Sequence, residues 1–283
     1  MIYSLSNHLY HIQVSTLGAE LLSLEKEGVN YLWTKSPPFW QRHAPVLFPI
    51  VGKLKGNSYQ YHGKEYTLPQ HGFARDSKFE CVEEKDDTLL FRLVETREIN
   101  FPFQYDFYIR YSLSGNGVKT TYTVENKGVE ALPFSIGAHP GFLCPFFDEE
   151  KLEDYYFEFE ADLTLNRTLL TDGLLTLENQ SILLENKRLY LSELLFEDDA
   201  LVISNFKSKS VALKSDRFSL KVTWDNCTFL GLWKQRQAPF VCIEPWWGVA
   251  DSINHNQDIL IKRGINLLAP EEKKDFWFEI AIG

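Results

Sequence analysis

Hydrophobic and polar residues alternate along most of this chain or gather in short runs rich in β-branched and aromatic side chains. The clearest runs are residues 89–94, 107–111, 118–124, 155–159, 201–203, 210–213, 220–224 and 276–280. Turn-forming sequences separate such runs, at residues 61–64, 114–117, 126–128 and 171–173. Short strands divided at regular intervals by turns are typical of antiparallel sandwiches and barrels.

Helical patterns are scarce in the sequence. Residues 192–196 favour one short helical turn with Ser192 as its N-cap, and no longer amphipathic run stands out. No low-complexity linker or repeat divides the chain. We therefore predict an all-β protein in which residues 1–283 form a single domain, a large antiparallel β-sandwich whose two layers bury the many aromatic side chains.

Composition and charge narrow the functional classes. A net charge of −10 at pH 7 disfavours nucleic-acid binding, because an acidic surface repels phosphate backbones. The four cysteines are far apart and form no CxxC pair, which argues against a disulfide framework and against structural zinc. The first residues resemble no secretory signal, and no long apolar window suggests a membrane span. We expect a cytoplasmic protein that does not bind membranes.

Three short strings carry the candidate chemistry. They are residues 70–76 (Gln-His-Gly-Phe-Ala-Arg-Asp), 137–142 (Gly-Ala-His-Pro-Gly-Phe) and 242–248 (Cys-Ile-Glu-Pro-Trp-Trp-Gly). Two of them place a histidine beside glycine or proline, and the third places a glutamate beside two tryptophans. Such groups suit acid/base chemistry on a sugar that stacks on an indole. The strings are far apart, so they can cooperate only if the fold gathers them.

The two histidines and the glutamate each follow a strand-like run. His71 lies in a loop where Gly72 allows unusual backbone angles, and His139 ends an apolar run. Glu244 ends the apolar run 240–243, where an unpaired carboxylate is costly. Trp246 and Trp247 would desolvate it and raise its pKa, which makes it a better base. Structural roles for these residues, as a surface loop histidine, a hydrogen-bonded core histidine or an ion-paired glutamate, remain open.

Three further polar side chains are candidates for substrate binding. Lys53 ends an apolar stretch and Arg75 closely follows His71, so either can bind sugar hydroxyls or a phosphate. Asp199, next to Asp198, precedes an apolar run and can accept hydrogen bonds from a sugar. The alternatives are solvated surface cations and an aspartate that caps a turn. Trp246 and Trp247 can also bind the substrate by offering an apolar face on which a sugar stacks. Trp233 can do the same or simply fill the core.

Taken together, residues 70–75, 139–142 and 243–246 resemble the corresponding strings of the aldose 1-epimerase (galactose mutarotase) family, and most closely its shorter subgroup. Residues 16–21 are also similar to the first hairpin of that family. The resemblance extends over almost the whole chain. It implies a large antiparallel β-sandwich, often called a supersandwich, with an open carbohydrate cleft.

The resemblance also implies roles for individual residues. Glu244 matches the general base of the family, His139 its general acid and His71 a second histidine near the ring oxygen. Asp199 matches an aspartate that accepts from a sugar hydroxyl. Lys53 stands where well-studied members carry an arginine. Arg75 lies in a Gly-Phe-Ala-Arg string that hexose-6-phosphate mutarotases share, so the resemblance allows a phosphorylated sugar.

These observations predict a mutarotase that interconverts the α and β anomers of an aldose or sugar phosphate. Glu244 would take the O1 proton while His139 donates to O5 from the opposite side of the reacting centre. The chemistry requires no cofactor and no metal. We expect a small-molecule sugar as the partner and a monomer or homodimer in solution.

Three other functions are compatible with the same residues. Two histidines and a glutamate can form a 2-His-1-carboxylate metal site. Aromatic and polar groups can serve a sugar-binding or sensor protein without catalysis. Glu244 and Asp199 can form the carboxylate pair of a glycoside hydrolase if about 5–9.5 Å separates them.

Overall fold

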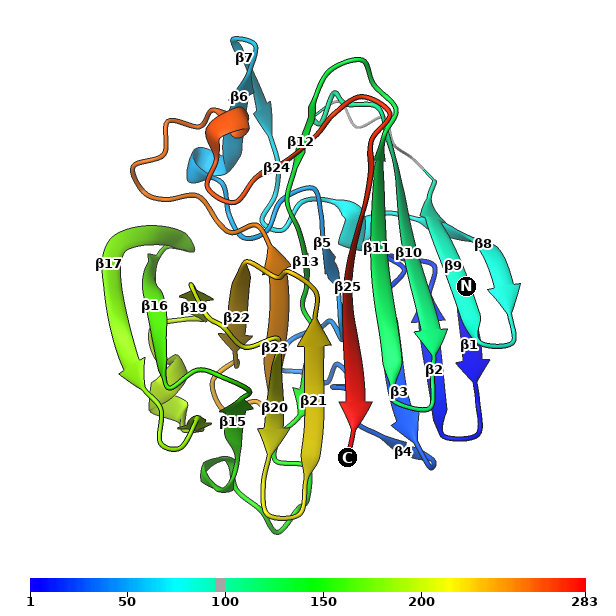
Figure 1. The fold of residues 1–283 in the computed structure, drawn as a ribbon, viewed down its shortest axis with the longest axis vertical. Helices are drawn as coiled ribbons and strands as arrows, with labels where there is room; N and C mark the ends of the chain where they lie inside the picture. The colour runs from blue at the N-terminus through cyan, green and yellow to red at the C-terminus, as the bar shows by residue number, and fades with distance from the viewer. Residues whose placement is uncertain (95–99) are drawn as a thin grey trace.

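The computed structural model describes residues 1–94 and 100–283, which fold into antiparallel β-sheets (Figure 1). The larger of the two main sheets has nine strands. In spatial order they are β18 (Arg188–Tyr190), β15 (Tyr156–Phe159), β20 (Ser210–Lys214), β21 (Ser219–Trp224), β25 (Lys273–Ile282), β11 (Val118–Asn126), β10 (Tyr105–Leu113), β9 (Thr88–Leu93) and β8 (Phe79–Lys85).

The second main sheet has eight strands and carries the residues of the candidate site. In spatial order they are β17 (Leu174–Leu183), β16 (Thr164–Thr171), β19 (Leu201–Ser204), β22 (Phe229–Trp233), β23 (Phe240–Trp247), β13 (Ile136–Ala138) and β5 (Val46–Leu47), with β14 (Gly141–Leu143) also paired to β23. The strand β23 is buried along its whole length. It is therefore the element around which the neighbouring strands are placed.

Smaller sheets and short 3₁₀ helices complete the described part of the chain. The small sheets comprise β1 (Ile2–Ser6), β2 (Tyr10–Ser15), β3 (Leu21–Lys26) and β4 (Val29–Asn30); β6 (Ser58–Tyr61) with β7 (Lys64–Thr67); and β12 (Leu132–Phe134) with β24 (Asn266–Leu268). The 3₁₀ helices are η1 (Lys55–Asn57), η2 (Ala74–Asp76), η3 (Leu152–Asp154), η4 (Glu193–Phe196) and η5 (Ile259–Ile261). None of the described helices is long and apolar enough to cross a membrane.

Residues that alternate between apolar and polar in the sequence lie on the inner and outer faces of the sheets, respectively. In β10 and β11 every second residue is buried. Phe107 and Val124 point from the nine-stranded sheet into the same core as Ile243 and Trp247 of the other sheet. Each fully buried side chain of this size contributes about 1.5–3 kcal/mol. Burial of one face of each sheet therefore holds the two layers together.

The predicted all-β, antiparallel architecture is confirmed. The eight runs identified from the sequence correspond to β9, β10, β11, β15, β19, β20, β21 and β25. Ser192 caps η4 as predicted, because its hydroxyl accepts the Leu195 N–H at 3.3 Å. The predicted turn at residues 171–173 joins β16 to β17, with Asp172 and Gly173 both at positive φ, as a tight two-residue hairpin turn requires.

A buried carboxylate ties the N-terminal sheet to the segment that enters the site. Glu20, between β2 and β3, accepts the backbone N–H groups of His43 at 2.7 Å and Ala44 at 3.1 Å. Burial alone would raise the pKa of Glu20, but its hydrogen bonds with these two residues outweigh burial and lower it. The tether fixes the chain just after Trp40, whose ring lines the candidate site.

We predict that Glu20→Gln destabilises the protein by about 1–3 kcal/mol at neutral pH, because charge-assisted hydrogen bonds are lost. The depressed pKa gives stability that is present above the unfolded-state pKa and lost as the pH falls through the folded-state pKa. The penalty of the substitution should therefore shrink at acidic pH. Urea unfolding at neutral and at acidic pH measures the loss of stability, with Glu65→Gln, at an exposed position, as control. Equal losses for the two variants would contradict the tether.

Candidate active site

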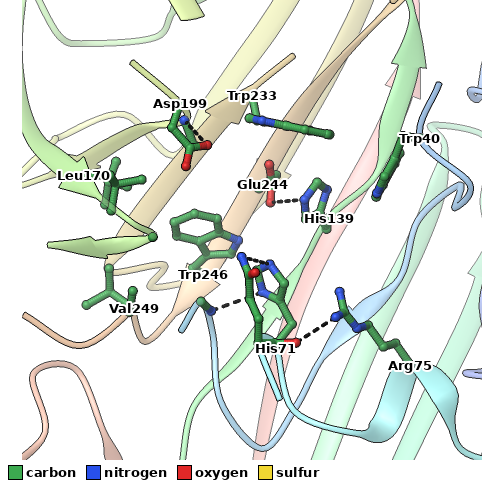
Figure 2. A pocket seen from close by; sticks show the side chains of 16 residues that line it. Trp40, His71, Arg75, His139, Leu170, Asp199, Trp233, Glu244, Trp246 and Val249 are labelled. Carbon is green, nitrogen blue, oxygen red and sulfur yellow. Dashed lines mark hydrogen bonds and ion pairs between the residues drawn. The ribbon is translucent and has the colours of Figure 1, made fainter. Parts of the chain in front are cut away.

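A cavity of about 280 Å³ opens on the face of the eight-stranded sheet that points away from the shared core. Its walls include the catalytic candidates His71, His139 and Glu244, which come from three distant parts of the sequence. Figure 2 shows these side chains converging from separate strands and loops. The fold thus gathers the three strings that the sequence analysis singled out.

Strand register places His139 beside Glu244. The short strands β13 and β14 both pair with β23, and they do so in one continuous register. His139 stands between them, two residues after Gly137 and two before Gly141. The same register puts His139 across from Glu244, and the His139 Nε2 atom lies 3.3 Å from Glu244 Oε2. The contact is therefore a product of sheet pairing and does not rely on a flexible loop.

Burial dominates the electrostatics of this pair. The Glu244 side chain is 1% exposed and that of His139 is 11% exposed. Burial raises the pKa of Glu244 well above its ordinary value, Asp199 adds to the shift, and a contact with the Trp246 indole opposes it. Burial lowers the pKa of His139 to about 3, helped by positive charge nearby. At neutral pH both shifts favour a protonated carboxyl facing a neutral imidazole, so the pair holds one proton.

His71 approaches the same place from a strained loop. Its backbone has φ +67°, and its N–H donates to the Gly52 carbonyl at 2.8 Å. The Gly52 N–H in turn donates to His71 Nδ1 at 3.1 Å. Since Nδ1 accepts, the neutral ring carries its hydrogen on Nε2. Burial, with His139 and nearby arginines, holds the pKa of His71 well below its usual range. His71 is thus neutral, and its Nε2 atom lies 3.4 Å from the side-chain amide nitrogen of Gln70.

Trp246 forms the floor of the cavity because its neighbours are glycines. A Cβ on Gly231 of β22 would meet the indole at 2.4 Å, and one on Gly137 of β13 would meet it at 2.6 Å. Only hydrogen at these two positions lets the ring lie across the sheet. The indole N–H, which is buried, has no hydrogen-bond partner within the protein. The result is a flat apolar surface with a polar edge.

Two more indoles fix the imidazole of His139. Trp40 stacks on it with ring centroids 4.7 Å apart, and Trp233 meets it edge-on at 5.4 Å. Both tryptophans line the cavity. They exclude water from one side of His139 and restrict its rotation, while His139 Nδ1 has no hydrogen-bond partner. Packing, and not a hydrogen-bonded carboxylate, therefore orients this ring.

Arginine side chains bring positive charge to another wall. Arg75 lines the cavity and donates to the Gln70 carbonyl at 2.7 Å. Its Nε atom lies 3.6 Å from Asp76, which also pairs with Arg42 at 2.8 Å. One carboxylate thus serves two guanidinium groups. Arg75 is the one of the two guanidinium groups that lines the cavity, where it can bind an electron-rich group.

Asp199 lines the cavity, whereas Lys53 lies in a hollow next to it. Asp199 lines the cavity from the start of β19, where its carboxylate accepts the Ala200 N–H at 2.7 Å. Lys53 does not line the cavity; it borders an adjoining hollow that shares Gln70, Gly173 and Asp199 with it, and its ammonium donates to the Asp172 carbonyl. Lys53 is therefore placed at the rim, further from the reacting groups than Asp199.

Trp247 does not reach the cavity, and its prediction as a sugar-binding residue is wrong. Successive residues of a strand point to opposite faces, so the face that exposes Trp246 turns Trp247 into the shared core. Its ring packs on Phe276 with centroids 5.5 Å apart, and its indole N–H donates to the Asp225 carbonyl at 2.9 Å. Only one of the two adjacent indoles can face a substrate.

The possible metal ligands also differ from the predicted 2-His-1-carboxylate set. Among the residues that the structure describes, the ligand atoms of His139, Cys242 and Glu244 lie within 4.8 Å of one another, and His71 is not part of this group. The His71 and His139 rings stand 5.8 Å apart, edge to face.

Comparison with known proteins gives the family of this fold and site. The family model described as aldose 1-epimerase matches residues 1–265. The chain belongs to the aldose 1-epimerase family. It is therefore an isomerase of the mutarotase-like kind, as the three sequence strings predicted.

Individual relatives match this chain over its whole length. Protein LacX (plasmid) of Lactococcus lactis subsp. lactis is 33% identical over 100% of this chain and 99% of its own. A galactose mutarotase related enzyme from Lactobacillus acidophilus superimposes with a TM-score of 0.95 at 35% identity, covering 100% of this chain and 97% of that one. A galactose mutarotase-like protein from Lactobacillus casei superimposes with a TM-score of 0.93 at 27% sequence identity, covering 100% of both chains.

Some residues of the candidate site were not predicted from the sequence. Trp40 lies in an irregular segment without periodicity, so nothing local links it to His139. Gly137 and Gly231 did carry a signal, since a glycine inside an apolar strand marks a close approach. Together, these two glycines indicate a large ring on β23, the strand between them.

We predict that Gly231→Ala lowers the rate of anomer exchange at least ~10-fold, because the new methyl group must push the Trp246 ring out of place. Polarimetry or NMR exchange measures the rate. Gly115→Ala is the matched control, since nothing lies within 4 Å of a Cβ there. Unchanged exchange in Gly231→Ala, with the protein folded, would show that the position of Trp246 is unimportant.

Proposed function

We propose that the cavity interconverts the α and β anomers of an aldose by opening and closing its ring. In this reaction the anomeric hydroxyl O1 loses a proton while the ring oxygen O5 gains one. The observation that carries the proposal is the 3.3 Å contact of His139 with Glu244 inside one buried cavity. A proton donor and a proton acceptor are thus held side by side where a sugar ring can reach both.

The two groups lie next to each other, and not on opposite sides of the reacting centre as the sequence analysis expected. Adjacency suits the reaction, because O1 and O5 are bonded to the same carbon of the sugar. Glu244 as carboxylate takes the O1 proton, and His139 as imidazolium donates to O5. Before that step the single proton of the pair moves from Glu244 to His139. Hydrogen bonds from the sugar would favour this charged form, and the nearby Trp246 indole lowers the pKa of Glu244 in the same direction.

The remaining cavity residues bind and orient the ring. The Nε2–H of His71 can donate near O5 and stabilise the charge that develops there. Trp246 offers the flat apolar surface on which a sugar face packs. Asp199 can accept from a hydroxyl, although one of its oxygens already accepts the Ala200 N–H. These roles account for the convergence of the Trp246 indole and several polar groups on a cavity large enough for one monosaccharide.

Arg75 would hold the part of the substrate that lies away from the reacting carbon. Its guanidinium lines the cavity, and the neighbouring Asp76 is shared with Arg42. A sugar hydroxyl or the phosphate of a sugar phosphate would bind here. Lys53 stands at the rim, so its ammonium would contribute weakly to binding of a monosaccharide and not to proton transfer.

We predict that Glu244→Gln or His139→Asn slows anomer exchange by ~10²–10⁴-fold, because each removes one proton-transfer group. NMR exchange or polarimetry over hexoses, pentoses and hexose 6-phosphates measures the effect. Lys53→Ala should instead raise KM with little change in kcat.

The exposed Glu65→Gln serves as the matched control for Glu244→Gln, since it makes the same change outside the cavity. A wild-type protein that binds sugars but accelerates no exchange would overturn the catalytic proposal and favour a sensor. Release of sugar from a glycoside would favour a hydrolase instead.

A further inference from the structure

The proposed reaction uses His139 and Glu244 but leaves a third reactive group beside them without a role. Cys242 precedes Glu244 by two residues on β23, so both side chains point to the same face. The ligand atoms of Cys242, His139 and Glu244 all lie within 4.8 Å of one another, and all three residues are buried. Apart from these polar neighbours, Cys242 packs among the apolar residues Trp33, Ala238 and Phe240.

A thiolate, an imidazole and a carboxylate form a favourable ligand set for zinc. Zinc binds sulfur at about 2.3 Å and nitrogen or oxygen at about 2.0–2.2 Å, which places tetrahedral ligand atoms roughly 3–4 Å apart. His139 and Glu244 already satisfy this spacing at 3.3 Å. Contraction by roughly 1 Å at most would bring the Cys242 sulfur to the same ion. Hard cations such as Mg²⁺ would not favour the thiolate.

The carboxylate of Glu244 has unused binding capacity. Glu244 Oε2, the atom that lies 3.3 Å from His139 Nε2, is buried and has no hydrogen-bond partner in the protein. Coordination would therefore break few existing hydrogen bonds. His139 and Glu244 line the cavity while Cys242 lies behind them, so an ion can enter from the cavity and keep one coordination position open toward it. Three protein ligands with a fourth open position are typical of accessible zinc sites.

We propose that His139, Cys242 and Glu244 form an inhibitory site for Zn²⁺ in this protein. The ion would occupy both proton-transfer groups at once, so exchange stops while it is bound. The inhibition rests on the proposed function, whereas the binding does not.

The proton balance of this binding is fixed by its ligands. Zn²⁺ takes the Cys242 sulfur as thiolate and Glu244 as carboxylate, and releases a proton from each group that was protonated.

The test uses the purified protein after chelation, with Co²⁺ as a spectroscopic probe and Zn²⁺ as inhibitor. Co²⁺ should give a sulfur-to-metal charge-transfer band in the wild type, and Zn²⁺ should abolish it. The band should vanish in Cys242→Ala and persist in the matched control Cys81→Ala, whose thiol lies on β8. Zn²⁺ should inhibit the wild type and Cys81→Ala at concentrations at least ~10-fold below those that inhibit Cys242→Ala.

The outcomes separate the two proposals. A band that survives in Cys242→Ala, or that never forms in the wild type, overturns the site. If Cys242→Ala does not fold, His139→Asn replaces it, since loss of a second ligand must also weaken the band. Zinc that binds at these residues without slowing exchange overturns the inhibition. Binding in a protein that exchanges no sugar leaves the site intact and rejects the proposed function.

Discussion

The contact between His139 and Glu244 is the interaction on which the site depends. Two ionisable groups 3.3 Å apart are held away from water, so neither can carry a charge without the other responding. Burial raises the pKa of one and lowers that of the other. Both shifts disfavour charge on the pair and favour a single proton on Glu244. In the proposed reaction that proton passes between the two groups.

The rest of the eight-stranded sheet supports that contact. Continuous pairing of β13 and β14 with β23 sets the separation of the two side chains. Glycines on both neighbouring strands leave room for the Trp246 ring, and stacking by Trp40 restrains His139. The His71 N–H donates to the Gly52 carbonyl and the Gly52 N–H donates to the His71 ring, and these two bonds bring His71 to the same cavity. Sheet geometry thus places His139, Glu244 and Trp246, and loops bring His71 to them.

Local periodicity was enough to predict the fold class, and short motifs were enough to predict most of the site. Alternation in β10 and β11 reflects burial of one face, which the sequence displays directly. The prediction that Trp247 binds sugar was wrong, although the alternation of side chains along a strand already indicates that Trp246 and Trp247 face opposite sides. Trp40 could not be predicted, since its contact with His139 depends on tertiary packing alone. The side-by-side placement of His139 and Glu244 follows from pairing register, which a single sequence does not reveal.

The most direct test of this account is to observe the proton of the buried pair. Isotope-edited infrared difference spectroscopy between the wild type and Glu244→Gln at neutral pH reports the protonation of that one carboxyl group. The account predicts the carbonyl stretch of a neutral carboxylic acid in the sugar-free protein, with its loss in the variant. A carboxylate signal alone would contradict it, because Glu244 would then be charged in the empty cavity.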